Sequence, residues 1–122
     1  MSYIEEMSLE VWSKLSELSP YDVLDTIPSN YDFVGKKIAV EYKIGENVLD
    51  QVYKNQYTLQ IRIVGNFNSQ LYKILNLAEF IDKEMNKAEI LGSRITRESP
   101  YMTSYNDEDK YNVVLQYLIN RY

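Results

Sequence analysis

The chain has 122 residues, 45% hydrophobic and 25% charged, with a formal net charge of −5 and neither cysteine nor histidine. This length predicts one globular domain over residues 1–122 with a substantial hydrophobic core, and the acidic balance argues against a surface that holds nucleic-acid phosphates. The absence of both residue types excludes disulfides and thiolate catalysis, and it removes the commonest general base and metal ligand.

The N-terminal segment predicts an amphipathic helix of about four turns. Ser2 and Glu5 have the spacing of a capping box, and Ser19 followed by Pro20 ends the helical pattern. Apolar residues recur between them at helical spacing: Ile4, Met7, Val11, Leu15 and Leu18. The acidic start differs from the plan of a signal peptide, so we expect synthesis in the cytoplasm. No apolar run approaches the ~20 residues that span a bilayer.

Residues 36–44 alternate between apolar and polar side chains, which predicts a strand with one buried face. The apolar set comprises Ile38, Val40, Tyr42 and Ile44. The following link, residues 45–56, is more apolar than a turn requires because it contains Val48, Leu49, Val52 and Tyr53. Two alternatives remain open for this link: it contacts a partner protein, or it folds back on its own domain.

The segment from Tyr57 to Met85 predicts a strand that leads through a turn into a helix. Alternating residues form the apolar face of the strand: Tyr57, Leu59, Ile61 and Ile63. The turn is expected at Gly65, Asn66, Asn68 and Ser69, with Asn68 or Ser69 capping the helix. The helical stripe comprises Leu71, Ile74, Leu75, Ala78, Ile81 and Met85.

The C-terminal third predicts two further strands, at residues 88–98 and 111–119, separated by a polar loop at residues 99–109. Because the last strand has apolar residues on both faces, we expect it to be central in the sheet or covered on both sides. The resulting fold class is α+β. We expect an antiparallel sheet of about four strands with two helices packed on one face, in the order α-β-β-α-β-β.

The remaining side chains form no catalytic pattern. Asp107, Glu108 and Asp109 make an acidic cluster, but they lack the alternating spacing and glycine of a calcium loop. Basic residues are interleaved with acids along the predicted strands, which favours surface ion pairs over a nucleic-acid patch. The prediction is therefore a protein that is not an enzyme and that binds no metal or cofactor.

Three segments carry a resemblance to a known group of proteins: YTLQIRIVGN, NSQLYKILNLAEFIDKEM and KYNVVLQYLI. In order and spacing the chain resembles the tail terminator and related neck or minor-capsid proteins of long-tailed bacteriophages and phage-like particles. That resemblance implies a small domain with an N-terminal helix, an antiparallel sheet and a helix crossing it.

The resemblance further implies a hexameric ring in the virion or phage-like particle that caps the tail tube and joins it to the neck or head connector. Its partners would be further copies of the chain, the tail tube protein and the neck or connector proteins. DNA would pass through without specific binding, and no membrane is involved. The expected contact residues are Val48, Leu49, Val52, Tyr53, Tyr101, Met102 and Tyr105.

Several alternatives stay open. The protein is a terminator or an adjacent neck protein, and the tail is contractile or flexible. A different class is a host-type protein-binding or immunity module that acts as a monomer or dimer. A third is a small-molecule enzyme, which would need a pocket lined by Asp, Glu or Tyr with perturbed ionisation.

Overall fold

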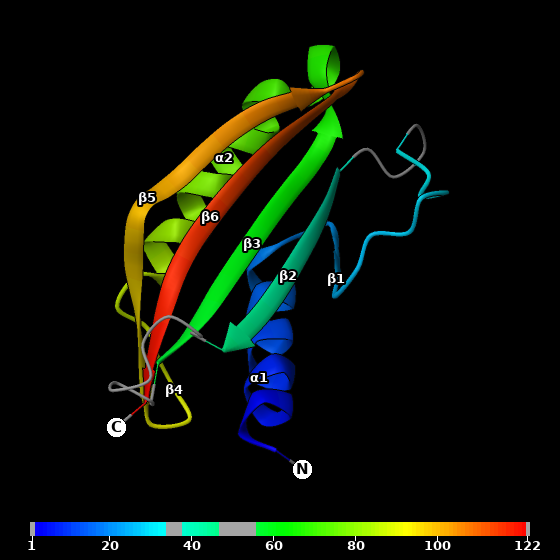
Figure 1. The fold of residues 1–122 in the computed structure, drawn as a ribbon. Coiled ribbons are helices and arrows are strands. Elements are labelled where there is room, and N and C mark those ends of the chain that lie inside the picture. The colour runs from blue at the N-terminus through cyan, green and yellow to red at the C-terminus, as the bar shows by residue number, and fades with distance from the viewer. Residues whose placement is uncertain (1, 34–37, 47–55, 122) are drawn as a thin grey trace.

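The structure, a computed structural model, describes residues 2–33, 38–46 and 56–121, which form two helices and six strands around one core. In chain order the elements are α1 (Tyr3–Leu18), β1 (Asp22–Leu24), β2 (Ile38–Glu46), β3 (Gln56–Asn66), α2 (Phe67–Met85), β4 (Glu89–Ile90), β5 (Ser93–Asp107) and β6 (Lys110–Arg121). Figure 1 shows β5 and β6 as long curved strands that arch over α2.

The six strands form a single curled sheet in the order β1-β2-β3-β6-β5-β4. The sheet is mixed, because β1 runs parallel to β2 whereas the other neighbours are antiparallel. The expected four-stranded antiparallel sheet with two helices on one face is therefore wrong. The reason is that β1 has three residues and β4 has two, too few to show the alternation that reveals a strand in sequence.

The C-terminal elements also differ from the prediction of a strand at residues 88–98 and a loop at 99–109. A tight hairpin turns at Leu91 and Gly92, whose φ angles of 50° and 72° are typical of a type I′ turn. β5 then continues to Asp107, and the next turn lies at Glu108, with φ 57°. A stretch rich in polar residues was expected to be a loop, but it forms a strand near the edge of the sheet, where polar side chains remain in solvent.

Within the described residues, the structure confirms both predicted helices. It also confirms the predicted strands at residues 36–44, 57–63 and 111–119. Ser2 caps α1 by accepting a hydrogen bond from the Glu5 amide at 3.2 Å. The predicted turn before α2 is wrong, since β3 leads directly into the helix and Asn66 is the N-cap residue. The Asn66 side chain does not cap the helix; its amide donates to the Phe33 carbonyl at 3.3 Å.

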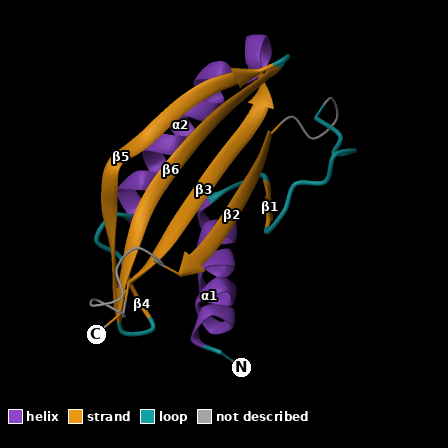
Figure 2. Cartoon of the chain, viewed as in Figure 1, coloured by secondary structure: helices purple, strands orange, loops and turns teal. Residues whose placement is uncertain are grey.

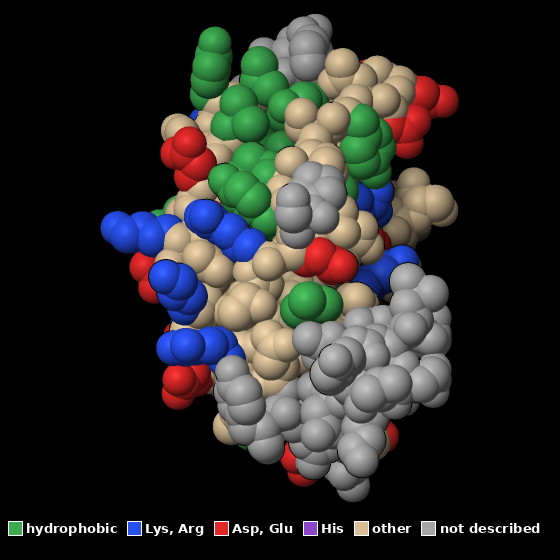
Figure 3. All heavy atoms as spheres, turned by 60° about the vertical axis from the view of Figure 1, so that its left-hand side comes forward, with side chains coloured by type: hydrophobic (Ala, Val, Ile, Leu, Met, Phe, Trp, Pro, Cys, Tyr) green, Lys and Arg blue, Asp and Glu red, His purple; other side chains and the backbone are tan. Residues whose placement is uncertain are grey.

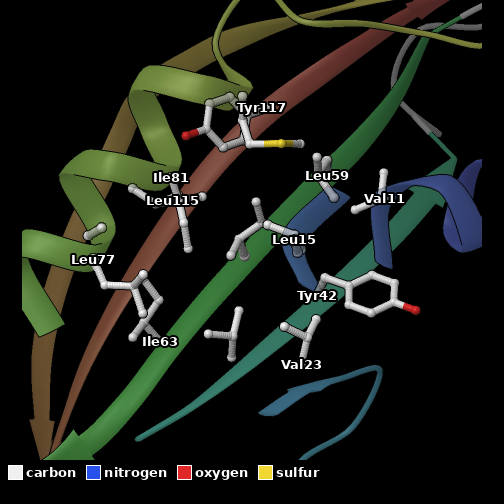
Figure 4. Close-up of a cluster of buried hydrophobic side chains, with 14 of the residues drawn as sticks. Val11, Leu15, Val23, Tyr42, Leu59, Ile63, Leu77, Ile81, Leu115 and Tyr117 are labelled. Atoms are coloured by element: carbon white, nitrogen blue, oxygen red, sulfur yellow. The ribbon is translucent and has the colours of Figure 1, made fainter. Parts of the chain in front are cut away.

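The core lies between the helices and the sheet, as Figure 4 shows for Val11 and Leu15 of α1, Leu77 and Ile81 of α2, and Leu115 of β6. α1 packs against β1 and β2, whereas α2 packs against β3, β5 and β6. The central strand β6 alternates cleanly, because Val113, Leu115, Tyr117 and Ile119 are all fully buried. Burying each such side chain contributes about 1.5–3 kcal/mol, so this layer holds the helices on the sheet.

Candidate functional site

A partly buried ion pair lies on the face of the sheet that points away from the core. Glu41 is 7% exposed, and its Oε1 accepts a hydrogen bond from Arg62 Nε at 3.2 Å. Arg62 also donates to Asn112 Oδ1 at 3.4 Å and makes a hydrogen bond with the Tyr105 side chain. Burial acts to lower the pKa of Arg62, but the hydrogen bond with Tyr105 and the charge of Glu41 outweigh burial and raise it.

Strand register places these groups together. Glu41 and Arg62 are directly opposite each other in β2 and β3. Arg62 in turn lies opposite Val114 of β6, and Asn112 is two residues along from Val114 on the same face. With Tyr105 of β5, which lies opposite Asn112, the cluster depends on four strands, and each strand contributes one side chain.

The connection from β1 towards β2 covers this cluster. Figure 2 shows the connection as a loop at the β1 end of the sheet. The Ile27 amide donates to Glu41 Oε2 at 2.9 Å, and the Tyr31 hydroxyl donates to Asp22 Oδ2 at 2.8 Å. Both Ala39 (0% exposed) and Val64 (5% exposed) are buried although they lie on this outer face. The loop and the ion pair thus give the sheet a second covered area.

A cavity of about 350 Å³ lies between this loop and the β5–β6 turn. Its lining comprises Ile27, Pro28, Ser29, Tyr31, Phe33, Arg62, Val64, Asp107, Glu108, Asp109, Lys110 and Asn112. Lys110 Nζ lies 5.2 Å from the Phe33 ring centroid and 2.7 Å from Asp109 Oδ1, and the pKa of Asp109 is lowered by the hydrogen bond with Lys110. The described residues contain no group of three or more acids placed to hold a metal ion.

Charged and hydroxyl side chains line the cavity. Its two cations, Arg62 and Lys110, are each matched by a carboxylate, so neither is left to balance the charge of an anionic substrate. The lining contains one serine, Ser29, but the chain has no histidine that would activate its hydroxyl group as a nucleophile.

A second polar cluster joins α2 to the sheet. Tyr117 donates a hydrogen bond to Asp82 Oδ1 at 2.7 Å, and Asp82 is 4% exposed. Arg97 binds the same carboxylate with Nε, 3.1 Å from Oδ2, and with a terminal nitrogen, and its guanidinium lies 4.2 Å from the Tyr101 ring centroid. The prediction of surface ion pairs is confirmed for Arg94 with Glu89. Arg62 and Arg97 also pair with carboxylates, but those of Glu41 and Asp82 are buried, which differs from the prediction.

Three of the seven predicted contact residues lie in the part of the chain that the structure describes. Val48, Leu49, Val52 and Tyr53 lie outside the described residues. Tyr101, Met102 and Tyr105 lie on β5 and not on a loop. Met102 packs against the core, Tyr101 lies beside Arg97, and Tyr105 is 45% exposed on the opposite face.

The two sides of the sheet each end in a strand segment with a free edge, a feature that sequence reasoning missed. β1 pairs with Ala39–Glu41 of β2, and no described strand pairs with the outer side of β2 beyond it. β4 pairs with Ser93 and Arg94 of β5, and no described strand pairs with the outer side of β5 from Met102 to Asp107. Only the sheet order, which periodicity does not give, reveals these edges.

Hydrophobic side chains gather near one of these edges. Figure 3 shows them on the upper part of the face on which β5 and α2 come forward, with most of the Lys and Arg side chains lower down. Over the whole described part of the chain, the large apolar residues that are at least 45% exposed are Leu9 and Trp12 of α1, Tyr72 and Phe80 of α2, Leu91 and Tyr105. Tyr72 is the most exposed of these, at 76%. An exposed aromatic residue of this kind is typical of a protein–protein contact.

Neither described helix is long and apolar enough to cross a membrane. Comparison with known proteins found no family model and no curated protein that matches this chain.

Proposed function

We propose that this chain is a structural virion-morphogenesis protein, a tail terminator whose copies form a hexameric ring that caps the tail tube and joins it to the neck or head connector. One observation carries the proposal: among the described residues, no strand pairs with the outer side of β2 beyond Glu41 or with the outer side of β5 from Met102 to Asp107. Two different free surfaces on opposite sides of a subunit allow head-to-tail contacts, and such contacts close into a ring when the rotation between copies permits it.

The mechanism is geometric. One face of the ring binds the last layer of the tail tube and stops its growth, and the other face binds the neck or connector proteins. The ion pairs of the described arginines and the formal charge of −5 leave little unbalanced positive charge to hold DNA, which suits passage of DNA through the ring.

A second candidate is a host-type protein-binding or immunity module that acts as a monomer or dimer. The cavity below the loop supports this candidate, since Tyr31 and Phe33 give it aromatic walls that suit a partner side chain. In that case the free edges of β2 and β5 would not contact further copies.

Deletion of the coding sequence from the source bacterium tests the proposal. We expect the mutant to make headless tails of uncontrolled length, and a plasmid copy of the gene to restore normal particles. Particles of normal length and infectivity in the deletion strain would overturn the terminator function and favour the second candidate.

A further inference from the structure

We infer that the free edge of β5 pairs antiparallel with the free edge of β2 in a neighbouring copy, with Ser104 opposite Ile44 of that copy. This inference rests on the proposed ring function and names the contact that would close the ring. It follows from the direction of the backbone groups, from the register of the sheet and from the charges beside the two edges.

The backbone groups of β5 point towards the free edge at alternate residues. The Ile95 amide donates to the Ala88 carbonyl at 2.8 Å and the Ile95 carbonyl accepts from the Lys87 amide, so Ile95 directs both groups away from β6. Ile95 pairs with Ile119 of β6, and Ser104 pairs with Val113, an even number of residues along β6. Alternation in an antiparallel ladder then directs the amides and carbonyls of Met102, Ser104 and Asn106 outward.

The same alternation continues across the sheet to β2. Ile44 pairs with Leu59, and Leu59 pairs with Tyr117 of β6. Tyr117 directs its backbone groups towards β3, so those of Ile44 point to the outer side of β2. Among the described residues, no backbone group faces the donors and acceptors of either edge. β5 from Met102 to Asp107 also contains no lysine or proline to discourage pairing.

Strand directions make the contact antiparallel. In the observed order β2 and β5 run in opposite directions, because each of the three intervening neighbours is antiparallel. Copies related by rotation about a ring axis keep this relationship, so β5 of one copy meets β2 of the next with opposite direction. The sheet then continues from one copy to the next, and the face that covers the core in one copy is continuous with the same face of its neighbour.

The pairing requires a stagger that a ring can supply. Within one copy, Ser104 pairs with Val113, Val113 with Ile63 and Ile63 with Val40, so Ser104 and Val40 lie at the same height in the sheet. Ile44 lies four residues beyond Val40 along β2. This offset is about 13 Å, across a repeat of four strands about 19 Å wide. The strands must therefore tilt by about 35° from the ring axis, which is the tilt usual in closed barrels.

Side chains beside the edges complement each other. In this register Lys43 lies opposite Tyr105 and diagonal to Asp107, and all three are exposed on the same outer face. Asp107 itself falls level with Glu41, whose carboxylate is paired with Arg62 and whose edge is taken by Leu24 of β1, so the new pairing ends at Asn106 and Tyr42. Beside the β2 edge, a hollow of about 420 Å³ is lined by Ile4, Glu5, Ser8, Leu9, Asp25 and Tyr42. The apolar side chains near the β5 edge of the neighbouring copy would pack into this hollow.

Engineered cysteines test the contact cleanly because the chain has no cysteine of its own. We would make Ser104→Cys and Ile44→Cys, separately and together, and oxidise them in the purified chain and in cells that assemble particles. Ser104 and Ile44 would form a hydrogen-bonded pair, with Cα atoms about 5.5 Å apart, a separation that a disulfide spans. We expect dimers only when the two single variants are mixed, and a ladder of higher oligomers from the double variant. Ser16→Cys on the exposed face of α1 is the control partner, and it should not cross-link.

A backbone variant gives an independent readout. Ser104→Pro removes an outward amide at an edge that tolerates proline, and we expect it to fold normally but to associate about tenfold more weakly or worse. Ser104→Ala keeps the amide and should associate like the parent chain.

The failure of this inference is distinguishable from the failure of the proposed function. Cross-linking of Ser104→Cys with itself would mean symmetric β5–β5 pairing, and normal particle assembly by a folded Ser104→Pro chain would mean another contact; either result overturns the inference while the terminator function stands. A chain that cross-links as expected but is absent from particles would retain the inference and overturn the function.

Discussion

Glu41 and Arg62 form an ion pair on the side of the sheet away from the core, and the Ile27 amide donates to the same carboxylate. The pair therefore connects three segments of the chain, β2, β3 and the loop that follows β1. Because the Glu41 side chain is 9% exposed and that of Arg62 is 31% exposed, water screens the pair only in part.

Glu41→Gln should destabilise the folded chain by about 2 kcal/mol, less than the cost of breaking a fully buried pair, because Arg62 keeps some access to water. Denaturant unfolding followed by circular dichroism measures the change. Glu89→Gln is the matched control, since Glu89 and Arg94 form an exposed pair with a separation of 3.8 Å. We expect that control to change stability by less than about 0.5 kcal/mol; equal effects in the two variants would contradict a structural role for Glu41.

Tyr117 should give the chain a specific sensitivity to alkali. Burial and the Asp82 carboxylate raise the pKa of Tyr117 above its ordinary value of 10.0. The unfolded chain therefore loses this proton at lower pH than the folded chain. The stabilisation is complete below about pH 10, and the free energy of unfolding falls as pH rises above that value.

Tyr117→Phe removes this contribution. Above about pH 10, the free energy of unfolding of this variant should fall less steeply with pH than that of the parent chain, by up to about 1.4 kcal/mol per pH unit. Urea unfolding at several pH values measures both slopes. Tyr72→Phe is the matched control substitution, because Tyr72 is 76% exposed. Identical slopes in all three chains would show that Tyr117 ionises normally.

The turn between β4 and β5 should accept a stabilising change. Leu91 has φ 50° and is 45% exposed, and Gly92 follows it with φ 72°. Asn-Gly is the preferred pair for a type I′ turn, so Leu91→Asn should stabilise the chain by about 0.5–1 kcal/mol. Gly92→Ala should destabilise it by about 1 kcal/mol, because alanine is strained at that angle. Thermal unfolding of both variants would contradict this turn assignment if the two changes had the same sign.

Tyr72 should matter to assembly but not to folding. Its side chain is 76% exposed, so Tyr72→Ala should change the free energy of unfolding by less than about 0.5 kcal/mol. Exposed aromatic residues often carry much of an interface's binding energy, and we expect at least about tenfold fewer complete particles from this variant. Lys73→Ala, the next residue along the same helix, is the control. Full particle yield from the Tyr72 variant would place the contact elsewhere.

The parts of the fold that depend on residues close together in the chain could be predicted from the sequence. The Ser2–Glu5 cap and the alternation from Tyr57 to Ile63 depend on neighbouring residues alone, and both predictions are confirmed. β4 could not be found in this way, because two residues carry no period and the turn at Leu91 lacks the usual asparagine. The far end of β5 was mistaken for a loop because an edge strand needs little apolar surface.

The candidate site was harder to predict than the fold. Glu41 and Arg62 lie on the polar faces of two predicted strands, and such residues are expected in solvent. Their opposite charges on consecutive strands were the available signal, but the pairing depends on the register of β2 and β3. Their burial depends on a loop whose position the sequence does not indicate.

Gold labelling of this protein on particles purified from an induced culture of its source, viewed by electron microscopy, tests the central claim most directly. The terminator proposal predicts label at the head–tail junction, or at the head-proximal end of headless tails. Intact particles without label, together with abundant protein in the particle-free fraction, would contradict it.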